Sequence, residues 1–113
     1  MSCEIINASK GVTLFSQAVV ARSFWQRFKG LMLRRSMSEK EAVVFFNTNG
    51  LHTFFMLFDL DIIFLNKELK VIKVCKNVKP WRMVWCFNAY AAFEMKPFDI
   101  SNRVALGDLI RVS

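Results

Sequence analysis

The side chains that could do chemistry gather around residues 52–65, the most apolar stretch of the chain. His52 is the only histidine among 113 residues, so no second imidazole can share a metal ion with it. Zinc and iron sites need several ligands that lie close together. The other possible donors are scattered along the chain: Asp59, Asp61, Cys75, Cys86 and Glu94. The sequence therefore predicts no metal and no cofactor, and it favours His52 as a satisfied or surface side chain.

A nucleophilic pair of His52 with Cys75 or Cys86 is a second possibility, because a thiol becomes reactive beside a base. Nothing in the sequence around either thiol indicates activation, so we expect both to be buried and inert. The three cysteines have no CxxC spacing, which predicts neither a disulfide framework nor a zinc site. Reduced thiols are normal in the cytoplasm, where we expect the protein to be.

Asp61 lies inside an apolar run, and a buried carboxylate is very costly unless it is paired or hydrogen-bonded. We expect a structural partner for it: Arg34, Arg82 or backbone N–H groups at a bend. The alternative is a general base that works with His52 in a pocket, which needs a cleft and a raised pKa.

Aromatic and basic residues alternate at Trp81-Arg82 and around Trp25 and Arg27. Such platforms bind single-stranded nucleic acid. No RNA-recognition, KH or cold-shock signature accompanies them, so the pattern favours amphipathic packing at the rim of the fold.

The formal charge of +7 would attract nucleic acid, anionic lipid or an acidic protein, although it also serves solubility. With 54% hydrophobic residues and twelve Phe, either the core is unusually aromatic or part of this surface meets a partner. The first residues have no features of a signal peptide. The apolar span 42–65 is broken by polar residues and carboxylates, so we expect no transmembrane helix.

Short alternating or continuous apolar runs between turn signals predict a mainly β fold in a single domain, 1–113. The fold would be a small closed barrel or sandwich of short strands with one or two short helices. Helix is expected over 23–30 and in one turn ending at 103. Strands are expected at 4–7, 12–15, 19–21, 42–46, 62–65, 70–78, 83–87, 90–95 and 109–112. If residues 52–58 also form a continuous strand, alternation puts His52, Phe54, Met56 and Phe58 on one face, with a kink, bulge or loop at 59–61.

Basic residues recur at every third position after Lys67: Lys70, Lys73, Lys76, Lys79 and Arg82. A period of three matches neither a strand face nor a long helix face. We interpret the segment as an exposed edge strand protected by lysine, with a linear phosphate-binding stripe as the alternative.

Several segments resemble one family. Residues 29–34 (KGLMLR) resemble its Arg-Gly-Leu-Met-x-Arg signature, and residues 52–56 (HTFFM) followed by 61–65 (DIIFL) resemble its His-Thr-Phe-Phe-Met and Asp-x-x-Phe-Leu signature. Residues 79–82 (KPWR), 92–95 (AFEM) and 106–108 (LGD) resemble further elements in the same order. On these residues the chain is identified as a member of domain-of-unknown-function family 192. The resemblance implies a compact mainly β fold and no agreed activity.

The chain departs from the family pattern at three places. Leu57 stands where a basic residue is usual, Asp59 stands where proline is common, and residues 96–98 (KPF) replace small residues and glycine. If the basic position or the glycine turn matters to a family ligand, this member would bind something else.

We therefore expect an uncharacterised binding or interaction module without catalysis of its own. Its ligand-binding rim would contain His52, Met56, Asp61, Trp81 and Arg82. The alternatives are a nucleic-acid-binding accessory protein and a small enzyme that uses Asp61 and His52. The sequence alone leaves the partner and the oligomeric state open.

Overall fold

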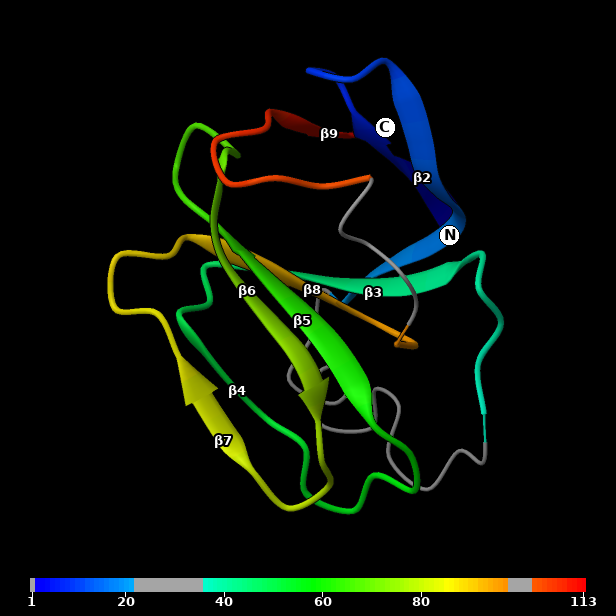
Figure 1. Cartoon of the computed structure of the whole chain (residues 1–113), viewed down its shortest axis with the longest axis vertical. Helices are drawn as coiled ribbons and strands as arrows, with labels where there is room; N and C mark the ends of the chain where they lie inside the picture. Colours follow the sequence, from blue (N-terminus) through cyan, green and yellow to red (C-terminus); the bar gives the residue numbers. More distant parts are fainter. Residues whose placement is uncertain (1, 22–35, 98–102) are drawn as a thin grey trace.

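The chain folds into two β-sheets of very different size (Figure 1). The computed structural model describes residues 2–21, 36–97 and 103–113. These residues form nine strands: β1 Ser2–Asn7, β2 Val12–Ala21, β3 Glu41–Phe46, β4 Gly50–His52, β5 Leu60–Leu65, β6 Val71–Val78, β7 Met83–Trp85, β8 Ala91–Met95 and β9 Ile110–Val112. The predicted mainly β class is confirmed.

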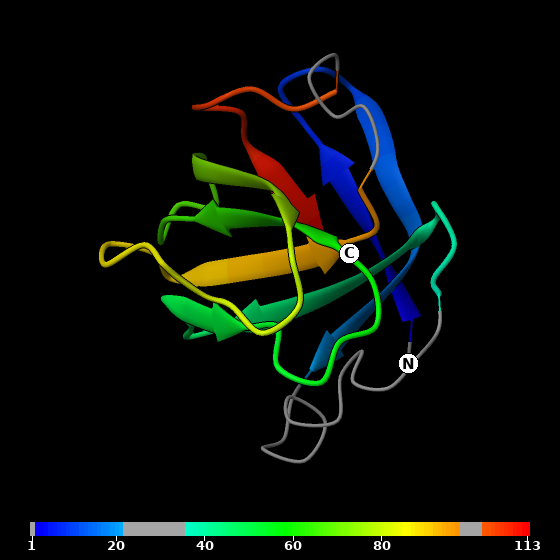
Figure 2. The same ribbon diagram turned by 60° about the horizontal axis from the view of Figure 1, so that its bottom comes forward.

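The large sheet has the strand order β6-β5-β8-β3-β2-β1-β9. All neighbours in it are antiparallel except β2 and β3, which run parallel. The small sheet pairs β4 with β7 and lies to one side of the large sheet (Figures 1 and 2). The two chain ends lie side by side, since Glu4 and Ser113 exchange both backbone hydrogen bonds.

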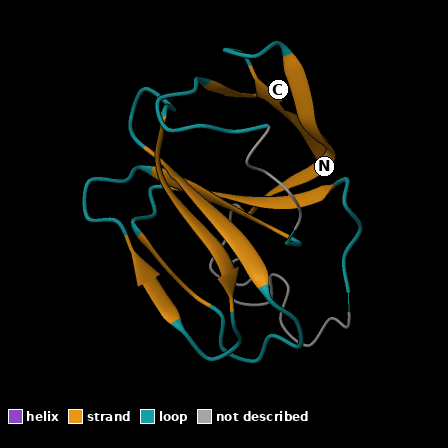
Figure 3. Cartoon of the chain, in the orientation of Figure 1, coloured by secondary structure: helices purple, strands orange, loops and turns teal. Residues whose placement is uncertain are grey.

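The expectation of a closed barrel is wrong for the described residues. The large sheet does not close into a barrel: β6 and β9 approach each other at one isolated bridge, Lys70 with Leu109. With three residues, β9 is too short to pair along the eight residues of β6. No helix occurs in the described residues (Figure 3), and hence none that could cross a membrane. The helix expected over 23–30, and all but the last residue of the turn ending at 103, lie outside them.

The core consists of two clusters on opposite faces of the large sheet. Strand β5 has six buried side chains in a row, because Ile63 and Leu65 face the first cluster while Ile62 and Phe64 face the second. The expectation that residues 62–65 form a central strand is confirmed, since β5 lies between β6 and β8. At about 25 cal/mol per Å² of apolar surface, burial on both faces makes β5 a main source of stability.

The three-residue period of the lysines follows from the position of β6. This strand is at the edge of the large sheet, as predicted. Val71 and Val74 pack on the first cluster and Ile72 and Cys75 on the second, so two apolar positions alternate with one exposed lysine. Two register shifts against β5 interrupt the ordinary alternation and allow this pattern. The lysines also leave the open edge unsuitable for pairing with another chain.

Candidate functional site

The small sheet has one covered face and one open face. Its pairs are Gly50 with Trp85, Leu51 with Val84 and His52 with Met83. Leu51 and Val84 pack against the second core cluster. Side chains alternate along a strand, so His52, Met83 and Trp85 belong to the opposite face. Met83 and Trp85 are exposed there.

Trp85 is positioned by a glycine on the neighbouring strand. A Cβ atom added to Gly50 would lie 3.0 Å from Cδ1 of the Trp85 indole. The ring therefore lies close over the glycine, and a side chain at position 50 would force it to shift by a few tenths of an ångström. An aromatic side chain over a cross-strand glycine is a recognised way to stabilise a glycine in a sheet.

A chain of ring contacts continues this open face beyond β4. The His52 ring stacks on Phe54 at a centroid distance of 4.9 Å, and Phe54 stacks on Trp81 at 5.7 Å. The Trp81 ring also contacts the Phe55 ring, with a centroid distance of 4.6 Å and a tilted arrangement. Nδ1 of His52 accepts a hydrogen bond of 3.2 Å from the backbone N–H of Phe54, which fixes the orientation of the imidazole. His52 and Trp81, both predicted as binding residues, thus belong to one aromatic array.

The buried Thr53 joins the two loops that carry these rings. Its hydroxyl donates to the carbonyl of Lys79 at 2.7 Å and accepts from the backbone N–H of Arg82 at 2.9 Å. Its own backbone N–H donates to the carbonyl of Arg82, and its carbonyl accepts from the N–H of Trp81. These bonds connect residues 52–56 to residues 79–82, two of the segments on which the family resemblance rests.

Two of the aromatic residues have strained backbones. Phe55 and Trp81 both have φ of 64°, in the left-handed region that bulky residues rarely adopt. Such a conformation costs about 1–2 kcal/mol per residue, so surrounding contacts must hold it. The hydrogen bond from Trp81 to Thr53 is one of those contacts.

Four large apolar side chains at alternate positions are exposed along this segment. Trp81 is 55% exposed, Met83 50%, Trp85 59% and Phe87 90%. Phe87 is at the tip of a turn that Ala89 closes by donating to the carbonyl of Cys86 at 2.8 Å. We call the following residues the outer face: His52, Phe54, Phe55, Trp81, Met83, Trp85 and Phe87. The sequence reasoning missed Met83, Trp85 and Phe87, although the alternation of residues 81–87 was the available signal.

Basic side chains run beside the outer face. Nζ of Lys73, on β6, donates to the carbonyl of Trp85 at 2.6 Å, which brings β6 next to β7. Lys79 forms an ion pair with Asp59 at 3.2 Å. Lys76 and Arg82 are exposed. The guanidinium of Arg82 donates long hydrogen bonds to the carbonyls of Pro80 and Trp81, so this predicted site residue folds back on its own turn.

The other predicted binding residues are buried. Met56 packs in the second core cluster. Asp61 is 1% exposed, and its Oδ1 accepts a hydrogen bond of 2.8 Å from the backbone N–H of Asn77 on β6. Asn77 has φ of 52° and lies where the β5–β6 register shifts, so Asp61 stabilises a bulge in the neighbouring strand. Arg34, Trp25 and Arg27 lie outside the described residues.

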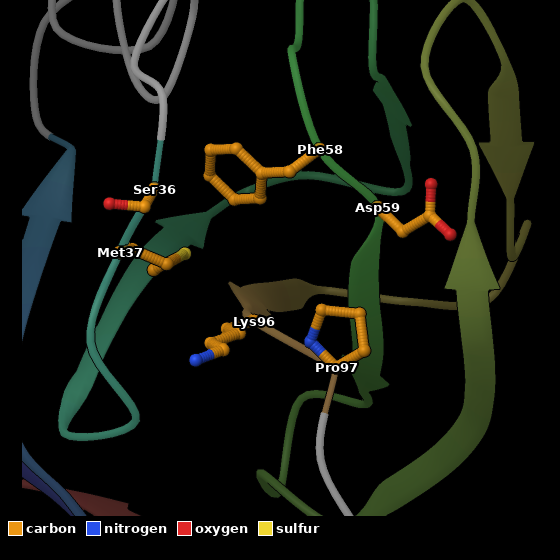
Figure 4. Close-up of a pocket in the computed structure, with 6 residues that line it drawn as sticks. All are labelled: Ser36, Met37, Phe58, Asp59, Lys96 and Pro97. Atoms are coloured by element: carbon orange, nitrogen blue, oxygen red, sulfur yellow. The ribbon is translucent and has the colours of Figure 1, made fainter.

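A cavity of about 300 Å³ opens near the end of β8 (Figure 4). Its lining combines apolar and polar side chains: Ser36, Met37, Phe58, Asp59, Lys96 and Pro97. The Phe58 ring points toward Ser36 and Met37, while the Asp59 carboxylate points away from the other side chains. Its volume is at the lower end of the range for small-molecule sites.

A buried acid that the sequence reasoning named only as a possible metal donor lies on β8. Glu94 is 5% exposed and pairs with Val43 on one side and Ile62 on the other. Both neighbours belong to or pack on the second core cluster. No described residue gives the carboxyl a hydrogen bond or an ion pair, and burial raises its pKa from 4.5 to about 8. Its place inside the apolar run of residues 91–95 was the signal in the sequence.

Neither thiol considered as a nucleophile has the surroundings of an activated cysteine. Cys75 and Cys86 are half-buried and pack on the second core cluster. Burial is the main cause of a raised pKa of Cys75, which favours the neutral thiol over the reactive thiolate. Within residues 2–21, 36–97 and 103–113, no three His, Cys, Asp or Glu side chains are grouped as metal ligands would be.

Comparisons with known proteins indicate the same family as the sequence motifs. The model of family DUF192, described as an uncharacterized ACR, matches residues 5–110. A UPF0127 protein of Pyrococcus abyssi (strain GE5 / Orsay) is 37% identical over 111 residues, covering 96% of this chain and 89% of that protein. A UPF0127 protein of Thermococcus sibiricus is 34% identical over 84 residues, and the match spans 53% of its length and 69% of this chain. The chain thus matches about half the length of that relative.

Two crystal structures have the same fold at low sequence identity. A protein of unknown function from Novosphingobium aromaticivorans DSM 12444 has a TM-score of 0.82 at 20% identity, covering 98% of this chain and 84% of that one. A protein from Sinorhizobium meliloti 1021, described as a candidate transcription regulator, has a TM-score of 0.81 at 19% identity. The match covers 97% of this chain and 91% of that one. The motifs, the family match and the relatives together show that this chain belongs to the DUF192 family of uncharacterised proteins.

Proposed function

We propose that this domain is a binding module whose ligand surface is the outer face, and that it has no catalysis of its own. The observation that carries the proposal is the exposure of Trp81, Met83, Trp85 and Phe87 at alternate positions. Small monomeric domains rarely expose apolar side chains so close together unless the surface meets a partner.

The arrangement of the rings supports the same function. Trp81 is held by Phe54 and Phe55, and Trp85 lies against Gly50. Rings that are already fixed lose little conformational entropy when a ligand covers them, which favours binding. Of the residues predicted from the sequence, His52 and Trp81 belong to the outer face, and Arg82 follows Trp81 at its edge.

The enzyme alternative has less support. Asp61 already accepts a backbone hydrogen bond at a bulge, and Nδ1 of His52 already accepts one from Phe54. The Asp61 carboxylate and the His52 imidazole therefore each take part in a hydrogen bond that supports the local backbone. These contacts favour a structural role for Asp61 over that of a general base.

Binding of anionic probes tests the proposal, because the chain carries +7 charges. Three probes would be titrated at about 50 mM salt: oligothymidylate, phosphatidylserine vesicles and polyglutamate. The double variant Trp85→Ala/Phe87→Ala removes exposed rings without touching either core cluster. Leu106→Ala is the matched control, because Leu106 is 69% exposed but lies outside the outer face.

We expect at least one probe to bind the wild type and the control equally and the double variant at least about 10-fold more weakly. If no probe binds, or if the double variant binds like the wild type, the outer face is not a ligand surface.

A further inference from the structure

We propose that the outer face binds single-stranded nucleic acid; this inference rests on the proposed function and names its ligand. The residues that carry it are Trp81, Trp85 and Phe87, together with the cations of β6 and the following turn.

The aromatic side chains have the exposure of a stacking platform. The unpaired bases of a single strand can separate and stack on aromatic side chains, whereas the bases of a duplex stay stacked on one another. Trp81, Trp85 and Phe87 each have more than half of their surface open. Base stacking on such rings tolerates any sequence, because every base has a π-face.

The charges beside the platform match a phosphate backbone. Lys73 donates to the carbonyl of Trp85, so at least this cation of β6 lies directly beside β7. Lys76 is exposed on the same strand between Lys73 and the turn that carries Arg82. Asp59 neutralises Lys79 through their ion pair, and the other three cations have no carboxylate partner among the described residues.

An anionic membrane is the competing ligand, since it too attracts aromatic and basic groups. The contacts of the rings favour the nucleic acid. Trp81 stacks on Phe54 at an interplanar angle of 27°, and Trp85 lies against Gly50, so the protein holds both rings before a ligand arrives. Stacking with a base benefits from a ring that is already held, whereas insertion into lipid does not depend on a fixed ring orientation.

The test is fluorescence anisotropy with a fluorescein-labelled oligothymidylate of about 12 nucleotides, within the usual site size. A stacked ring is worth roughly 5- to 150-fold in affinity, so Trp85→Ala/Phe87→Ala should weaken binding at least about 10-fold. Leu106→Ala should bind like the wild type. Lys76→Gln should reduce the slope of log affinity against log salt by about 0.7, whereas Lys40→Gln, an exposed lysine elsewhere, should leave the slope unchanged.

The same variants are also titrated with phosphatidylserine vesicles and polyglutamate. These probes distinguish a failure of the nucleic-acid inference from a failure of the proposed binding module. If the oligonucleotide does not bind at about 50 mM salt while another probe binds through Trp85 and Phe87, the nucleic acid is the wrong ligand and the binding module stands. If the oligonucleotide binds the double variant as tightly as the wild type, the attraction is net charge alone and the inference is overturned. A duplex of the same length bound as tightly as the single strand would also overturn it.

Discussion

Replacing Glu94 by glutamine should flatten the dependence of stability on pH. Glu94 is buried between β3 and β5 without a charged partner among the described residues, and its pKa is about 8 in the folded protein instead of 4.5. Below pH 4.5 both folded and unfolded states hold the proton. Between the two pKa values only the folded state holds it, so the free energy of unfolding falls as pH rises, by about 1.4 kcal/mol per pH unit.

The size of the effect follows from these two pKa values. Between pH 5 and pH 8, linkage gives a loss of roughly 3–4 kcal/mol in the wild type. That is a large share of the 5–15 kcal/mol that is typical for a small domain. Glu94→Gln cannot ionise, so its stability should lack this decline.

Urea unfolding followed by tryptophan fluorescence at pH 5, 6, 7 and 8 measures the difference. Glu68→Gln, which removes an exposed glutamate from a turn, is the matched control and should decline in parallel with the wild type. The comparison uses slopes, so a general destabilisation by Glu94→Gln does not affect it. Parallel profiles for Glu94→Gln and the wild type would refute the reasoning, because they would mean that Glu94 ionises as readily when folded as when unfolded.

Two further substitutions test the contacts that support the outer face and the large sheet. Thr53→Val keeps the shape but removes the hydroxyl that bonds Lys79 and Arg82, so unfolding free energy should fall by about 1–3 kcal/mol, whereas Thr13→Val at an exposed position should have little effect. Asp61→Asn weakens the acceptor for Asn77, so the melting temperature should drop. An unchanged melting temperature would show that Asp61 has no structural role.

Much of the strand pattern could be predicted from local sequence. The apolar run of β5, the exposed lysines of β6 and the requirement of Asp61 for a partner all follow from side-chain chemistry. Backbone N–H groups were among the predicted partners, but the particular N–H did not follow from the sequence. Asn77 is on another strand, and its N–H is available to Asp61 because of a register shift that no local pattern reveals.

The sheet closure could not be predicted for a related reason. The count of short strands is compatible with a barrel, but closure depends on the edge strands being long enough to pair, and β9 has three residues. The unusual pKa of Glu94 has the same origin. It requires the neighbouring strands to cover the carboxyl from both sides, whereas the sequence indicates only that the acid lies in an apolar run.

By itself, the sequence determined that this is a mainly β protein with aromatic and basic side chains around residues 79–87. Only the tertiary structure decided which side of those residues faces water. Alternation gives two faces to every strand, and burial depends on what packs against each face. Leu51 and Val84 meet the second core cluster, which leaves Met83 and Trp85 uncovered on the outer face. That long-range choice turns an apolar strand into a candidate binding surface.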